Sequence, residues 1–138
     1  MTVFYIIQIF SLLTGLLIYV LFRENTYISK IILSQIPLTE VKALFSCLEC
    51  DFVKYYLPDF LWALSLGCGI YIILKPQGTR QALLCSLITF LSGLCYELLQ
   101  LYGIISGTGD VIDISLYFSA ALTVNIIYLG EKKYEKNN

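Results

Sequence analysis

The sequence predicts an all-α fold: a bundle of four transmembrane helices, with amphipathic interfacial helices in the first extracytoplasmic loop. Hydrophobic residues make up 58% of the 138 residues and charged residues only 14%, whereas a water-soluble domain carries about 25% charged residues. The apolar residues also gather in four stretches that are long enough to cross a bilayer, which takes about 20 residues in a helix. We therefore treat residues 1–138 as a single integral membrane domain.

The four spans are bounded by charged residues, prolines and glycines. Pro37, Pro58 and Pro76 all lie at or outside the predicted helix ends, where a missing backbone N–H does little harm. The predicted spans cover residues 3–22, 57–74, 81–102 and 111–129. Outside them, the sequence predicts an interfacial loop, residues 23–56, and a cytoplasmic tail, residues 130–138.

The loop between the first two spans is too apolar to be a free linker. Leu38, Val41, Phe45 and Leu48 recur at helical spacing. This pattern is typical of one or two amphipathic helices that lie on the outer membrane interface. A lid packed on the helix bundle is the alternative, and the two interpretations are compatible.

The distribution of Lys and Arg predicts that both termini face the cytoplasm, because basic residues in short loops favour the inner side. On the side of the termini are Lys75, Arg80, Lys132, Lys133 and Lys136. On the opposite side are Arg23, Lys30, Lys42 and Lys54, spread through a long loop that also carries acidic residues.

Composition also excludes several classes of function. The chain has 9 Lys and Arg against 10 Asp and Glu, a net charge of −1, so it offers no basic surface for a nucleic acid. It contains no His, and His is the commonest general base, metal ligand and pH switch. Phosphate-binding glycine loops and the G-x-S-x-G motif of hydrolases are missing from the sequence as well.

Four acidic residues lie within or at the edge of the predicted spans, where insertion of an ionisable group costs roughly 2.5–3.5 kcal/mol. Asp59, Glu97, Asp110 and Asp113 all fall at the same depth, in the outer half of the membrane. No Lys or Arg falls at that depth. Either some of the carboxyl groups are protonated, or a cation or a positively charged ligand group balances them.

Each acid has a structural explanation to weigh against a functional one. Asp59 and Asp113 fall in the first turns of helices, where the helix dipole favours a carboxylate, and Asp110 is an N-cap candidate. Glu97 falls near a helix C-terminus, where the dipole disfavours it, so capping does not explain it. Glu97 is therefore the one reasonable general base and the candidate catalytic residue.

The other candidates surround these acids. Gln100 follows Glu97 by one helical turn and shares its face. Thr108 either caps the next helix or points into the same cavity, and Trp62 is either a packing residue or a platform for a ligand. The predicted binding residues are Asp59, Trp62, Gln100, Thr108, Asp110 and Asp113. A divalent cation, Mg²⁺ or Ca²⁺, is a further option, held by the oxygens of Glu97, Asp110 and Asp113.

The string Tyr96-Glu-Leu-Leu-Gln100, followed by Gly107-Thr-Gly-Asp110 and then by Asp113, resembles the signature of the VanZ-like family of small bacterial membrane proteins. The segment Leu57-Pro-Asp-Phe-Leu-Trp62 is similar to the start of the preceding helix in that family. The resemblance covers residues 57–129. It implies a cell-envelope protein of the bacterial cytoplasmic (inner) membrane, in a family associated with resistance to glycopeptide antibiotics of the teicoplanin type.

One departure from the family pattern concerns a basic residue. Many members carry an Arg in the loop before the first of the two Asp residues, and this sequence has Ser106-Gly-Thr-Gly109 there. An anion-binding role for that Arg is therefore not carried over to this chain.

Two functions of different classes follow from these observations. The first is a VanZ-like envelope protein whose acidic pocket binds or acts on the head group of a membrane lipid, a glycolipid or a lipid-linked glycan. The second is a non-catalytic small subunit or scaffold of a larger membrane complex, with its acids anchoring helices or a membrane-protein partner. Ion conduction is less favoured, because no ionisable residue continues the acidic path into the inner half of the membrane.

The chain has five cysteines. Cys68, Cys85 and Cys95 fall in predicted spans, where we expect them to act as small apolar residues. Cys47 and Cys50 form a C-x-x-C on the predicted outer side, where a disulfide could persist. We interpret this pair as structural or incidental, and the sequence leaves its redox state open.

Overall fold

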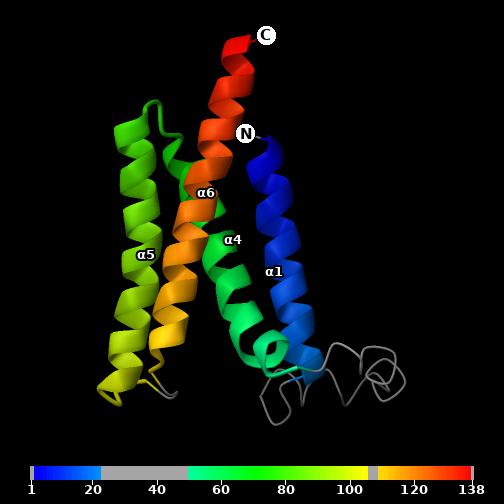
Figure 1. Cartoon of the computed structure of the whole chain (residues 1–138), viewed down its shortest axis with the longest axis vertical. Coiled ribbons are helices and arrows are strands. Elements are labelled where there is room, and N and C mark those ends of the chain that lie inside the picture. Colours follow the sequence, from blue (N-terminus) through cyan, green and yellow to red (C-terminus); the bar gives the residue numbers. More distant parts are fainter. Residues whose placement is uncertain (1, 23–49, 106–108, 138) are drawn as a thin grey trace.

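The computed structural model describes residues 2–22, 50–105 and 109–137, and within these ranges the chain is helical with no strand. The predicted all-α fold with four membrane-spanning helices is therefore confirmed (Figure 1). The elements are α1 (Thr2–Phe22), the π-helix η2 (Phe52–Tyr56), α4 (Leu57–Leu74), α5 (Thr79–Leu101) and α6 (Val111–Asn137).

The four long helices alternate in direction, and α4 is the central one. It packs against α1, α5 and α6, while α6 also packs along α5. The start of α1, the turn between α4 and α5, and the end of α6 lie at one end of the bundle (Figure 1). The end of α1 and the starts of α4 and α6 lie at the other end, which we call the acidic end because Asp59, Glu97, Asp110 and Asp113 lie there.

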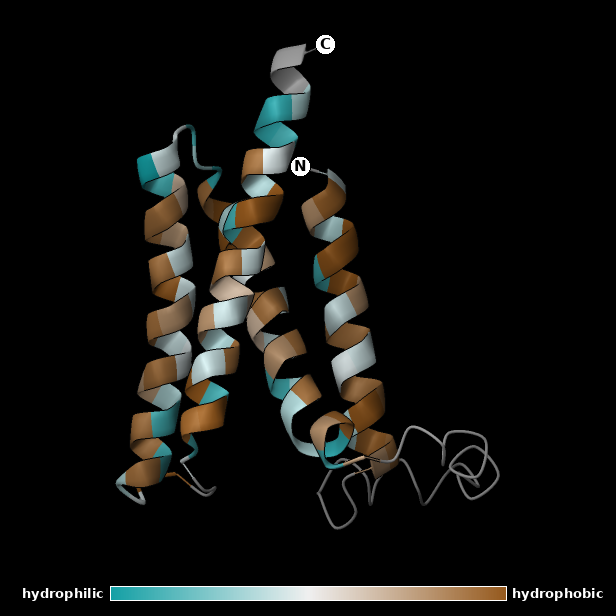
Figure 2. Ribbon diagram, in the orientation of Figure 1, coloured by the Kyte–Doolittle hydropathy of each residue, from teal (hydrophilic) through white to brown (hydrophobic). Residues whose placement is uncertain are grey.

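Each long helix is apolar enough to cross a membrane, so the chain is a multi-pass membrane protein. Apolar residues cover the outward faces of α1 and α5, and polar residues mark the end of α6 (Figure 2). Many large apolar side chains are exposed on these faces, for example Phe10 and Leu84. In a bilayer such a surface faces lipid, since hydrocarbon tails do not penalise it.

Three of the predicted spans coincide closely with observed helices, and the fourth lies within a helix that is longer than the span. Residues 3–22, 57–74 and 81–102 each lie within one or two residues of an observed helix. The fourth helix was expected to end at residue 129, but α6 continues to Asn137. Hydropathy marks where a helix leaves the membrane, whereas the Glu and Lys residues beyond Gly130 favour helix and extend it into water.

The predicted interfacial loop is described only at its end. Residues 23–49, which carry the expected amphipathic helices, lie outside the described residues. Phe52–Tyr56 forms one π-helical turn that continues directly into α4, so the apolar helical stretch begins at Phe52, ahead of α4 itself. Pro58 lies in the first turn of α4, as its missing N–H predicts.

A compact set of small and aromatic side chains fills the centre of the bundle. Tyr71 of α4 is buried and stacks on Phe4 of α1, with ring centroids 5.3 Å apart. Its hydroxyl donates to the Ala82 carbonyl of α5 and lies 3.0 Å from the Ser86 hydroxyl. Because polar groups in a membrane interior have no water to bind, these bonds also hold α4 against α5.

Glycines let helices approach closely near the acidic end. A Cβ atom added to Gly93 of α5 would lie 2.4 Å from Cγ of Tyr117 on α6. A Cβ atom added to Gly15 of α1 would lie 2.5 Å from the indole of Trp62 on α4. Small residues at such positions are typical of helix packing in membranes, and here they bring Tyr117 and Trp62 beside the acidic residues.

Candidate functional site

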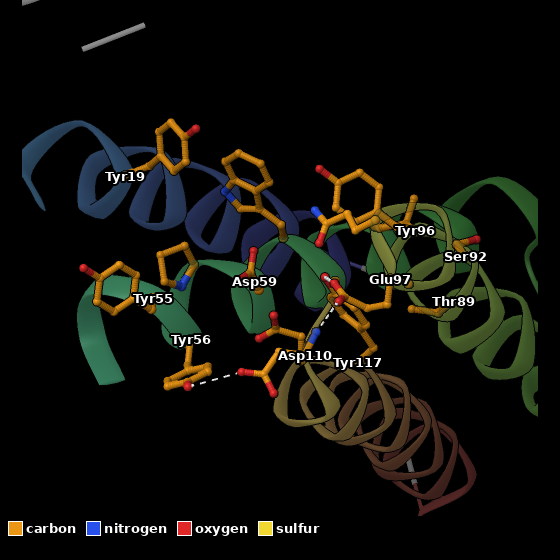
Figure 3. Close-up of a pocket in the computed structure, with 17 residues that line it drawn as sticks. Tyr19, Tyr55, Tyr56, Asp59, Thr89, Ser92, Tyr96, Glu97, Asp110 and Tyr117 are labelled. Carbon is orange, nitrogen blue, oxygen red and sulfur yellow. Dashed lines mark hydrogen bonds between the residues drawn. The ribbon is translucent and has the colours of Figure 1, made fainter. Parts of the chain in front are cut away.

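A cavity of about 560 Å³ lies at the acidic end of the bundle. Every described element contributes to its wall: Tyr19 from α1, Tyr55 and Tyr56 from η2, and further residues from α4, α5 and α6. Figure 3 shows Asp59 of α4, Glu97 of α5 and Asp110, which directly precedes α6, gathered around this space. Cavities that bind small molecules typically measure about 300–1,000 Å³, so the space suits a ligand.

The structure brings together nearly all of the residues predicted for the site. Thr108 is the exception, because it lies outside the described residues. The predicted residues that line the cavity are Asp59, Trp62, Glu97, Gln100, Asp110 and Asp113. The structure therefore places the acidic groups of separate spans in the wall of one cavity.

Glu97 is the most buried of these acids, with 3% of its surface exposed. Its Oε2 accepts a hydrogen bond from the backbone N–H of Asp110 at 3.0 Å, and its Oε1 accepts one from the Tyr117 hydroxyl at 3.1 Å. Both partners belong to the start of the next helix. Glu97 therefore joins the end of α5 to the beginning of α6.

This arrangement corrects the interpretation that capping does not explain Glu97. That interpretation considered only the helix to which Glu97 belongs, where a carboxylate near the C-terminus is unfavourable. In the folded hairpin the same side chain lies beside the N-terminus of the neighbouring helix, where free N–H groups and the helix dipole favour it. Glu97 thus has a structural role in addition to lining the cavity.

Asp110 is the N-cap of α6, as the sequence predicts. Its Oδ1 accepts a hydrogen bond from the backbone N–H of Ile112 at 3.0 Å, which is the usual N-cap geometry. Its Oδ2 accepts a longer bond, 3.4 Å, from the hydroxyl of Tyr56 (Figure 3). Asp110 therefore connects the start of α6 to the turn that precedes α4.

Aromatic side chains form much of the remaining wall, and most of them were not predicted as site residues. They are Tyr19, Tyr55, Tyr56, Tyr96 and Tyr117. The sequence could have indicated two of these tyrosines. Tyr117 follows Asp113 by four residues and so shares its helix face, and Tyr96 is the neighbour of Glu97. Tyr19 comes from a helix without acids, so nothing local indicated it.

Trp62 lies at the edge of the cavity and is 40% exposed. Its ring is tilted by 35° against that of Tyr19, with centroids 5.5 Å apart. The indole is thus held between α1 and α4 while one side stays open. Both interpretations of Trp62, packing residue and ligand platform, fit this position.

The predicted divalent-cation site has no support from the geometry. Among residues 2–22, 50–105 and 109–137, no three His, Cys, Asp or Glu side chains are placed so that they could hold a metal ion. Mg²⁺ and Ca²⁺ require about six or more oxygen ligands, and both oxygens of Glu97 already accept hydrogen bonds from the protein. We therefore assign no metal to Glu97, Asp110 and Asp113.

The four cysteines that the structure describes do not line the cavity. Cys68 and Cys85 are free and buried, as expected of small apolar residues in spans, and Cys95 is free and exposed. Cys50 is exposed at the acidic end. Cys47, its predicted partner, lies outside the described residues.

In comparisons with known proteins, no family model, no curated protein and no solved structure matches this chain.

Proposed function

We propose that this chain is a VanZ-like protein of the bacterial cell envelope that binds the head group of a membrane lipid, a glycolipid or a lipid-linked glycan. The observation that carries the proposal is the single cavity lined by acids from α4, α5 and α6. The motif residues that suggest the family, Glu97, Gln100, Asp110 and Asp113, all belong to its wall.

The orientation is part of the proposal. Lys75, Arg80, Lys132 and Lys133 belong to the end of the bundle opposite the cavity. Because basic residues favour the cytoplasmic side, we assign the termini to the cytoplasm and the cavity to the external face of the bacterial inner membrane. A ligand in the outer leaflet would then reach it directly.

We propose binding and assign no reaction. A general base must come within hydrogen-bond reach of the substrate proton, and only 3% of the surface of Glu97 is exposed. Both oxygens of Glu97, the catalytic candidate, accept bonds from Asp110 and Tyr117. Glu97 is better described as a positioning residue that fixes the α5–α6 hairpin around the cavity.

Lipid analysis of purified protein tests the proposal. The protein is extracted from a bacterial membrane into a mild detergent, and the bound lipids are identified by mass spectrometry for the wild type and for the variant Asp59→Asn/Asp113→Asn. Asp51→Asn is the matched control, because Asp51 is an exposed acid next to η2 that does not line the cavity. Thermal melting confirms that all three proteins are folded.

We expect one lipid class to accompany the wild type and Asp51→Asn at near-stoichiometric amounts and to fall at least tenfold, about 1.4 kcal/mol in binding, in the double variant. The same lipids in all three proteins would overturn the proposal. A stoichiometric protein partner in place of a lipid would favour the alternative, a small subunit or scaffold of a larger membrane complex.

A further inference from the structure

The cavity wall indicates what kind of head group it accepts. Building on the proposed function, we infer that the ligand is an amphiphile whose head group carries a positively charged ammonium group, and that its chain enters from the bilayer between α1 and α5. The inference rests on the charge of the wall, its aromatic rings and the side chains that the wall leaves exposed.

The charge of the wall favours a cation. Four carboxyl groups line the cavity, and among the described residues no Lys or Arg lines it. His does not occur in the chain. A head group whose only charge is a phosphate would be repelled here, whereas an ammonium group is attracted at short range.

The rings of the wall favour an organic cation over a metal ion. Five tyrosines and Trp62 surround the acids, and ring faces attract ammonium groups, as in the aromatic cages that bind quaternary ammonium ligands. One such contact already exists at the rim: the ammonium of Lys54 lies 5.3 Å from the centroid of the Tyr55 ring. A metal ion would instead need converging oxygen ligands, and the described residues provide no such group.

The wall is open on the side between α1 and α5. Both helices pack against α4, and α5 packs also against α6. Three lining residues on this side are substantially exposed although they lie within the spans: Trp62 (40%), Leu66 (47%) and Tyr96 (50%). In a membrane this opening faces lipid.

The wall also changes character with depth. The acids lie at the end of the bundle, while Leu66 follows Asp59 by seven residues and Thr89 precedes Glu97 by eight. At 1.5 Å per residue, these two lie about 10–12 Å deeper in the membrane. The acidic and aromatic part of the wall thus lies nearer the end of the bundle than the part made of small and apolar side chains. This order matches a charged head group followed by a hydrocarbon chain.

Trp62 provides the readout, because it is the only Trp of the chain and it lines the cavity. The protein is held in micelles of an octaethylene glycol dodecyl ether, which carries neither charge nor sugar. Three probes with the same dodecyl chain are added: dodecyltrimethylammonium, dodecyl phosphate and dodecyl maltoside. The emission of Trp62 is followed against the mole fraction of each probe.

We expect saturation with dodecyltrimethylammonium at a mole fraction at least tenfold lower than with dodecyl phosphate. Asp59→Asn/Asp113→Asn should raise the ammonium midpoint at least tenfold, and Asp51→Asn should leave it unchanged. Saturation with the phosphate or the maltoside at an equal or lower mole fraction overturns the ammonium inference and leaves head-group binding intact. Saturation with none of the three probes counts against both the ammonium inference and the proposed binding of a head group.

A matched pair of serine variants tests the lateral entry. Ser92 lines the cavity on α5, and Ser119 lies on α6 outside it. Both are exposed, and each donates to the carbonyl four residues earlier at 2.8 Å. Ser92→Phe should raise the dodecyltrimethylammonium midpoint severalfold and Ser119→Phe should not. Equal midpoints for the two variants would overturn entry between α1 and α5.

Discussion

The carboxylate of Glu97 makes two hydrogen bonds that cross from α5 to α6, and it is nearly inaccessible to solvent. Buried donors left without an acceptor cost about 1–3 kcal/mol each. The identity of the residue at position 97 should therefore decide how firmly the hairpin is held. Two substitutions separate its hydrogen bonds from its charge.

Glu97→Gln should unfold at a free energy close to that of the wild type, because the amide oxygen can accept from the Asp110 N–H while the amide nitrogen donates to the Tyr117 oxygen. Glu97→Ala leaves both donors unpaired and should destabilise the protein by about 1–3 kcal/mol for each. Unfolding in SDS titrations, followed by circular dichroism, measures the difference. Equal stability of the Ala and Gln variants would show that these bonds do not hold the hairpin.

The same residue shows how far sequence reasoning reaches at this scale. The pattern at 97, 100, 110 and 113 selects residues that line one cavity, because helical spacing and a short connection constrain their faces. It did not predict that Glu97 caps α6, because that contact exists only after the hairpin closes. Tyr19 was missed for a similar reason, since its place in the wall depends on how α1 packs against α4.

Between elements, close approach of α5 and α6 depends on Gly93. A Cβ atom added at position 93 would lie 2.4–2.9 Å from three atoms of the Tyr117 side chain, two of them in the ring. Overpacking of this kind typically costs about 1–3 kcal/mol. The contact matters for the site because the ring of Tyr117 is part of the cavity wall and its hydroxyl binds Glu97.

Gly93→Ala should therefore lower the free energy of unfolding by about 1–3 kcal/mol. Gly130→Ala on α6 is the control, because nothing lies within 4 Å of its added Cβ atom. In that variant the better helix propensity of Ala should raise stability by about 0.8–1 kcal/mol. SDS titrations measure the free energy of unfolding of both variants. A Gly93→Ala protein as stable as Gly130→Ala would mean that Tyr117 can move aside freely.

The contact of α1 with α4 gives a second test between elements. Gly15→Ala places a methyl group against the Trp62 indole. Because Trp62 is 40% exposed, we expect the indole to rotate toward the open side of the cavity. The emission maximum of Trp62 should shift, while the free energy of unfolding changes by less than about 1 kcal/mol because the indole can yield. An unchanged emission spectrum, with Gly130→Ala as reference, would contradict the close contact between α1 and Trp62.

Helix bounds show which parts of the elements hydropathy can predict. Apolar stretches located all four spans, because a bilayer demands about 20 apolar residues wherever a helix crosses it. They did not predict the π-helical turn at Phe52–Tyr56 or the extension of α6 to Asn137. Both lie at the ends of spans, where helix propensity and local packing decide where a helix ends.

At the scale of the whole molecule, acidic side chains and the cavity lie at one end, while both chain termini and most basic residues belong to the other. This polarity links the two proposals, since an ammonium-bearing lipid of the outer leaflet reaches the cavity only if the acidic end faces outward. The orientation can be measured without any knowledge of the ligand. Cys50 is exposed at the acidic end and Lys133 is exposed at the other.

A membrane-impermeant maleimide added to intact cells, after mild reduction, should label a Cys95→Ala protein at its outer cysteines. Adding Cys47→Ser and Cys50→Ser should abolish that labelling, because the remaining thiols of Cys68 and Cys85 are buried within the bundle. Lys133→Cys in this last background should react only after the cells are permeabilised. The opposite pattern, with Lys133→Cys labelled on intact cells, would show that the cavity faces the cytoplasm. It would also exclude an outer-leaflet lipid as the ligand.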